Sequence, residues 1–321
     1  ERKLSKKRAS ISELSGVSLI IGHGASLICE KPDVLVYADM ARWEIQQRMR
    51  KNMIQNLGLK NNAEKAEVQY KRAFFVDWRA CDRLKKKLRP RIDFWLDTNG
   101  TVPKMLSKDT YDESLRQGIN QPFSLVPFFD PGPWGGQWMR EKFELDADAE
   151  NFAWCFNCVP EENSLLLQFG EVVFETPSIN LVFFHPKELM GASVYSRFGD
   201  EFPIRFDFLD TMNGGNLSLQ VHPLTEYIQE KFGMHYTQDE SYYLLDAKPG
   251  AQVYLGLKND VDKKQMFSEL REAQKGKPFD ADKYVATWKA RKHDHFLIPA
   301  GTIHCSGNDS MVLEISATPY I

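Results

Sequence analysis

The spacing of hydrophobic and polar residues differs between the two ends of the chain. In the first 118 residues, short apolar runs predict strands at 17–21, 34–38, 73–77 and 92–97. Residues 41–57 carry apolar side chains every three to four positions, which predicts an amphipathic helix, and a basic helix is predicted around Lys85–Arg89. Because these strands alternate with helices, the pattern predicts an α/β segment with a parallel sheet.

After residue 118 the pattern changes to short apolar strands between Pro-rich and Gly-rich turns. Strands are predicted at 165–169, 172–174, 180–184, 204–209, 217–221, 241–245, 252–257, 294–299 and 311–315. Helices are predicted at 224–232 and 263–274. Many short strands separated by turns are typical of a β-sandwich or barrel. We therefore predict an α+β multidomain protein, with an α/β segment over 1–118 and a β-barrel over 119–321.

Composition excludes several classes of protein. Of the 321 residues, 42% are hydrophobic and 26% are charged, which is enough apolar side chain for a core and excludes global disorder. No apolar run approaches the roughly 18 residues of a membrane span. With a net charge of -3, the chain lacks the excess of basic residues that is typical of nucleic-acid-binding proteins. We therefore expect neither a membrane nor a nucleic-acid partner, and the oligomeric state is left open.

The chain has five cysteines, which is an odd number and too few for a disulfide framework. This count predicts a reducing, cytoplasmic compartment. Cys155 and Cys158 form one C-x-x-C, but a structural zinc site takes four ligands and no second pair exists, so we expect them to pack as small hydrophobes. The strand predicted at 311–315 has nothing after it to close it, so we expect a longer gene product.

Two of the seven histidines occur in settings suited to metal binding. In the predicted strand 217–221, alternation places Ser218, Gln220 and His222 on one polar face, which needs polar partners or a metal. Glu240 and His304 each lie at the start of a later strand. Gln220, His222, Glu240 and His304 would supply a donor set suited to Zn²⁺, Fe²⁺ or Mn²⁺ with an open position. Solvated strand ends are the alternative interpretation.

A series of motifs in the second segment then occurs in a recognisable order. They are Asp130–Gly136 with Trp134, Phe202–Asp210, Gln220-Val-His222-Pro223, Glu240 before Tyr242–Ala247, and Pro299–His304. In this order, residues from about 125 to the end resemble the type I mannose-6-phosphate isomerases, which are cupins. The resemblance implies a jelly-roll barrel in which Gln220, His222, Glu240 and His304 bind the metal.

The resemblance also implies an activity in carbohydrate metabolism. Mannose 6-phosphate and fructose 6-phosphate would interconvert through an enediol, with one zinc ion per chain polarising the carbonyl. Trp134 and Ser218 would shape the sugar pocket. The alternative interpretation is that Trp134 only packs in a turn and that Ser218 is a solvated strand residue. The phosphate would need an Arg or a Lys.

This sequence departs from the family pattern at three points. Gln238 stands where the family usually has a Lys, the functional Arg of the family would lie beyond Ile321, and the second barrel of the family has no counterpart. The catalytic base is therefore unassigned, with Asp239, His235 and His295 as candidates. A catalytically weak cupin that binds or senses a sugar phosphate is the alternative function. Iron-dependent oxygen chemistry, typically with a His in place of Gln220, is a third.

Residues 1–110 have a fainter resemblance to the later half of uridine-kinase-like P-loop proteins. It rests on Val17–Ala25, Val34–Asp39 and the helix with Arg48 and Arg50. No G-x-x-x-x-G-K-[ST] motif occurs, so we expect a kinase-like remnant without a P-loop and without phosphotransfer. Arg48 and Arg50 are then interpreted as a solvated basic face.

Overall fold

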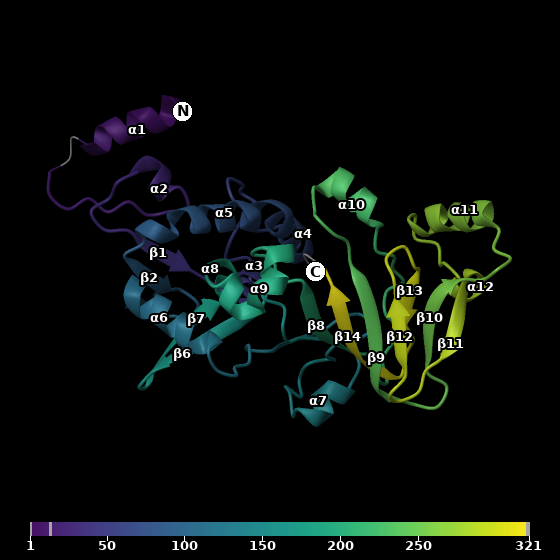
Figure 1. Ribbon diagram of the computed structural model, residues 1–321. Coiled ribbons are helices and arrows are strands. Elements are labelled where there is room, and N and C mark those ends of the chain that lie inside the picture. The colour runs from purple at the N-terminus through teal and green to yellow at the C-terminus, as the bar shows by residue number, and fades with distance from the viewer. Residues whose placement is uncertain (1, 13–14, 319–321) are drawn as a thin grey trace. The chain divides into compact units, whose positions relative to one another are not determined.

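The computed structural model describes residues 2–12 and 15–318, which form two compact units (Figure 1). The first unit comprises Glu1–Pro122 and Leu166–Thr176, and the second comprises Phe123–Leu165 and Pro177–Ile321. Within the described ranges, every helix falls short of the length and apolarity that crossing a membrane requires.

The first unit is built on a small mixed sheet. Its strands are β1 (Val36–Asp39), β2 (Phe94–Asp97) and β3 (Lys104–Ser107), in the order β1-β2-β3 (Figure 1). β1 pairs with β2 in parallel and β2 pairs with β3 antiparallel, so the predicted parallel sheet holds for the first pair only. The core stacks Trp95 on Tyr111 at 4.6 Å between ring centroids.

The first unit also contains helices. They are α1 (Arg2–Ser12), α2 (Ala25–Ile28), α3 (Arg42–Arg50), α4 (Ala66–Arg72), the π-helix η1 (Ala73–Asp77), α5 (Trp78–Leu88), the 3₁₀-helix η2 (Arg89–Arg91) and α6 (Lys108–Ile119). The predicted helix 41–57 ends early, because Asn52 takes a positive φ of 56°. Arg48 is not solvated as predicted, since it donates to Glu44 at 2.7 Å and to the Thr98 carbonyl at 2.8 Å.

Two strands predicted in this unit are wrong. Residues 17–21 form no strand, and Val17, Leu19 and Ile21 are exposed. Residues 73–77 form η1, which joins α4 to α5. The helical path buries the Asp77 carboxylate, which accepts a hydrogen bond from Asn56 Nδ2 at 2.7 Å. A short apolar run is compatible with a buried helix as well as a strand, and tertiary contacts decide between them.

The second unit contains two antiparallel sheets. The six-stranded sheet has the order β12-β9-β14-β8-β5-β4 and the three-stranded sheet has the order β11-β10-β13. The strands are β4 (Phe128–Asp130), β5 (Trp154–Phe156), β8 (Ile204–Asp210), β9 (Asp239–Ala247), β10 (Gln252–Leu257), β11 (Val285–Lys289), β12 (His295–Ile298), β13 (His304–Ser306) and β14 (Ser310–Ala317). A separate hairpin, most of which belongs to the first unit, pairs β6 (Ser164–Phe169) with β7 (Val172–Pro177).

Both sheets contribute to one core. Tyr242 and Leu244 of β9, Val312 of β14, Val253 of β10 and Val285 of β11 are buried in the same cluster. The chain is therefore a mixed α+β protein with several sheets. The strand pairs described do not join the two sheets into a closed barrel, so the predicted cupin jelly roll is not confirmed.

Helices of the second unit connect these strands. They are α7 (Trp138–Lys142), α8 (Ile179–Phe184), α9 (Pro186–Phe198), α10 (Thr225–Phe232), α11 (Lys263–Ala273) and α12 (Ala281–Tyr284). The strand predicted at 180–184 is wrong, because these residues form α8, and Ile179, Leu181 and Val182 are buried by packing rather than by strand pairing. The strand predicted at 217–221 is reduced to one bridge, between Gln220 and His304.

Candidate metal centre

Three predicted metal ligands lie together in the second unit. His222 follows the bridge residue Gln220, Glu240 lies near the start of β9, and His304 begins β13. One ligand atom from each of His222, Glu240 and His304 lies within 4.8 Å of the others. The site thus draws on both sheets, because β9 belongs to the larger sheet and β13 to the smaller.

The Glu240 carboxylate lies between the two imidazole rings. His222 Nε2 is 2.6 Å from Glu240 Oε1, and His304 Nε2 is 2.9 Å from Glu240 Oε2. Despite these short separations, His222 Nε2 and Glu240 Oε2 are buried and have no hydrogen-bond partner of acceptable geometry. Buried polar atoms normally have such partners. Atoms that converge without directed hydrogen bonds suit a cation held between them.

The backbone fixes the orientation of the His304 ring. His304 is fully buried, and its Nδ1 lies 2.8 Å from the Thr302 carbonyl oxygen. A carbonyl accepts only, so Nδ1 carries the proton and Nε2 keeps its lone pair. This is the arrangement that metal-binding histidines usually have, with the second nitrogen held by a backbone or carboxylate partner.

Gln220 lies beside this group on the same bridge. Its backbone N–H donates to the His304 carbonyl at 3.0 Å, and its amide nitrogen is 3.4 Å from His304 Nε2. The amide oxygen and nitrogen of a glutamine are exchangeable by a flip. The structure therefore places Gln220 next to His304, one of the three other predicted ligands.

The charge of Glu240 is set by its neighbours. Burial alone would raise the pKa of Glu240, but its contacts with the His222 and His304 rings outweigh burial and lower the pKa to about 2. The carboxylate is consequently ionised near neutral pH, as a metal ligand must be.

Two further carboxyl groups lie close to Glu240, and neither was among the predicted site residues. Asp207 of β8 pairs across the sheet with Glu314 of β14, and both are buried. Burial, followed by the charge of Glu240, raises the pKa of Asp207 to about 8. Burial first, then the charges of Asp207 and Glu240, also raise the pKa of Glu314. Alternation within 204–209 is the signal that could have found Asp207, because it shares a face with buried Leu209.

The remaining predicted residues have the following surroundings. Trp134 is in the core, 4.7 Å from the Trp154 ring, and Ser218 is exposed. His235 is 78% exposed beside Glu201, and His295 is exposed on β12 near Tyr243. The Asp239 carboxylate accepts a hydrogen bond from the Ala300 N–H at 2.9 Å.

The residues present fit a divalent cation. Two imidazole nitrogens and one carboxylate oxygen, with an amide oxygen available from Gln220, form a mixed nitrogen and oxygen set that leaves room for a further ligand.

Comparisons with known proteins each match a part of the chain. A family model described as a domain of unknown function (DUF8485) matches residues 1–120. Mannose-6-phosphate isomerase ManA of Bacillus subtilis is 23% identical over 195 residues, covering 60% of this chain and 57% of that protein. Mannose-6-phosphate isomerase of Streptococcus mutans is 27% identical over 183 residues, covering 56% of this chain and 52% of that protein.

The chain resembles mannose-6-phosphate isomerases. This confirms the resemblance predicted from the motifs, although the chain spans only about half the length of these curated relatives. A solved structure from Archaeoglobus fulgidus, provisionally named as a mannosephosphate isomerase, has a TM-score of 0.50 at 19% identity and covers 62% of this chain and 63% of that one. The likeness at this level shows a shared fold.

Gln238 is a neighbour of the site that can be tested directly. Its amide nitrogen donates to Glu240 Oε1 at 2.5 Å, which holds the carboxylate between the histidines. We expect Gln238→Leu to weaken the binding of a divalent cation by about tenfold, since outer partners of metal ligands typically contribute 10–100-fold to affinity. Competition titration with a zinc-binding dye measures this change. Gln117→Leu, which removes an amide bond to Glu113 on α6, is the matched control and should leave the affinity unchanged.

Proposed function

We propose that this chain carries a metal-dependent aldose–ketose isomerase site that interconverts mannose 6-phosphate and fructose 6-phosphate. The convergence of His222, Glu240 and His304 on one point is the observation that carries the proposal. The similarity of about 60% of the chain to proteins named mannose-6-phosphate isomerases supports the choice of substrate.

Zinc is the proposed ion, with Gln220 as the fourth ligand. Two imidazole nitrogens with oxygen donors form a set that zinc commonly occupies. When bound, the cation would polarise the carbonyl oxygen of the sugar and stabilise negative charge on it. The residues of the chain hold the site in shape: the Thr302 carbonyl orients His304, and the Gln238 amide orients Glu240.

We also propose that residues 1–118 form a separate domain that carries no phosphotransfer. The family model over 1–120 supports this division, as does the compact unit formed by Glu1–Pro122, which also includes the hairpin residues Leu166–Thr176. The isomerase site is then contained in residues 119–321.

A coupled assay of mannose 6-phosphate turnover on the zinc-loaded full chain tests the proposal. We expect turnover that a chelator abolishes and that added zinc restores, because the substrate carbonyl needs the cation for polarisation. Metal analysis of the same sample makes a negative result interpretable. About one zinc per chain without turnover would contradict the isomerase and favour a cupin that binds or senses a sugar phosphate.

A further inference from the structure

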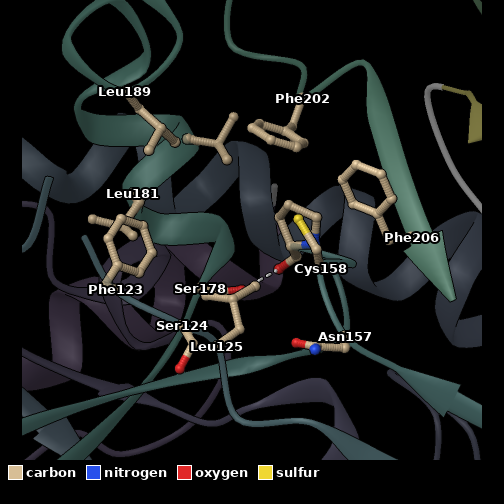
Figure 2. A pocket seen from close by; sticks show the side chains of 12 residues that line it. Phe123, Ser124, Leu125, Asn157, Cys158, Ser178, Leu181, Leu189, Phe202 and Phe206 are labelled. Atoms are coloured by element: carbon tan, nitrogen blue, oxygen red, sulfur yellow. Dashed lines mark hydrogen bonds between the residues drawn. The ribbon is translucent and has the colours of Figure 1, made fainter. Parts of the chain in front are cut away.

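A pocket of about 350 Å³ lies in the second unit among residues that the metal centre does not use. Its walls come from the segment before β4, the turn after β5, the helices α8 and α9, and the start of β8. In the view of Figure 2, Phe123, Leu181 and Leu189 lie on one side, with Phe202 and Phe206 on the other. A volume above about 300 Å³ is in the range of small-molecule sites.

The lining is apolar and uncharged. Eight of the twelve lining residues are apolar, and none of the twelve carries a charge. Three phenyl rings reach the pocket from two segments: Phe123 precedes β4, and Phe202 and Phe206 lie around the start of β8. A charged ligand would lose its hydration here without any compensating partner. Phenyl rings favour another aromatic ring, which they contact in edge-to-face or offset arrangements.

The pocket is lined by three polar side chains besides Cys158, and they differ in whether they are already hydrogen-bonded within the protein. The Ser178 hydroxyl is committed, because it donates to the carbonyls of Pro160 and Asn163 at 3.1 and 2.9 Å. The Asn157 amide and the Ser124 hydroxyl, in contrast, make no side-chain hydrogen bond to any residue that the structure describes. A ligand with one hydroxyl or carbonyl group could therefore be oriented by Asn157.

The backbone at Cys158 is held in an unusual conformation at this wall. Cys158 has a φ of 105°, which is strained for a residue with a Cβ, and its N–H donates to Asn163 Oδ1 at 3.2 Å. Strained residues occur preferentially at functional sites, where surrounding contacts hold them. Burial raises the pKa of the Cys158 thiol, so that it stays uncharged near neutral pH.

We propose that this pocket binds an uncharged aromatic molecule of one or two rings, with a single hydrogen-bonding substituent directed at Asn157. The shape, the absence of charge, the three phenyl walls and the uncommitted amide all point to this class. The inference does not depend on the proposed isomerase activity.

Protection of Cys158 from alkylation tests the proposal on the full chain, with p-cresol as the probe. We expect p-cresol at ten times its Kd, measured by ligand-observed NMR, to slow iodoacetamide labelling of Cys158 about tenfold, since roughly one site in eleven stays free. Peptide mapping reads each cysteine separately. Cys81, which is half-buried in the first unit, is the internal control and should label at an unchanged rate.

Variants separate the pocket from unspecific binding. Leu189→Trp on α9, a helix without buried residues, should fill the pocket and remove both the p-cresol signal and the protection. Leu297→Trp at an exposed position of β12 is the matched control and should leave both intact. If Leu189→Trp does not fold, Asn157→Leu should weaken p-cresol binding severalfold and leave toluene binding unchanged. Equal protection by benzoate, or binding that persists in these variants, would overturn the proposal.

Discussion

Replacing His304 with alanine is expected to abolish stoichiometric zinc binding. His304 is fully buried, its Nε2 faces Glu240, and its Nδ1 is held by the Thr302 carbonyl, so no neighbouring group can take over the lost nitrogen. We expect the zinc affinity to fall by more than about 100-fold, because even outer partners of metal ligands contribute 10–100-fold. Elemental analysis and competition titration of the purified variant measure the loss.

His295→Ala is the matched control for this experiment. His295 is exposed on β12 and lies beside Tyr243, whose position on β9 faces away from Glu240 because neighbouring strand residues alternate. Its removal should leave zinc content at one per chain. Full zinc loading of His304→Ala, with a circular dichroism spectrum like that of the parent, would show that the metal binds elsewhere.

The second large effect is expected from Arg205→Ala, through folding stability. Arg205 of β8 is completely buried and forms an ion pair with Glu161, which is also buried. Removing the guanidinium leaves the Glu161 carboxylate without a counter-charge in the interior. Breaking a buried ion pair in this way typically costs about 3–5 kcal/mol in the free energy of unfolding. Urea denaturation monitored by tryptophan fluorescence measures the change.

A double variant separates the lost charge from the lost packing. In Arg205→Met with Glu161→Met, both charges are replaced by apolar side chains of similar length. Such replacements are often neutral or stabilising, so most of the lost stability should return. A cost below about 1 kcal/mol for Arg205→Ala would mean that the pair is not buried as the structure describes.

The local motifs of the metal centre could be read from the sequence. Gln220 and His222 are two residues apart, and His304 follows a turn at Gly301, so short-range patterns identified them. The two histidines come close to Glu240 only because β9 and β13, which belong to different sheets, lie near each other. A local sequence pattern carries no information about that packing. The family resemblance supplied this long-range information, and the structure brings His222, Glu240 and His304 together.

Other features could not be predicted from local patterns. Asp207 and Glu314 look like ordinary strand residues, and only the pairing of β8 with β14 shows that two carboxyl groups meet close to Glu240. The apolar run at 180–184 has no period that separates a buried helix from a strand. The pocket at Asn157 and Cys158 likewise depends on segments that are distant in sequence.

Anomalous diffraction at the zinc edge, from zinc-soaked crystals of the full chain, tests the metal centre most directly. We expect one strong peak about 2.0–2.2 Å from His222 Nε2, His304 Nε2 and a carboxylate oxygen of Glu240. The absence of a peak at this point, or a peak at Cys155 and Cys158 instead, would contradict it.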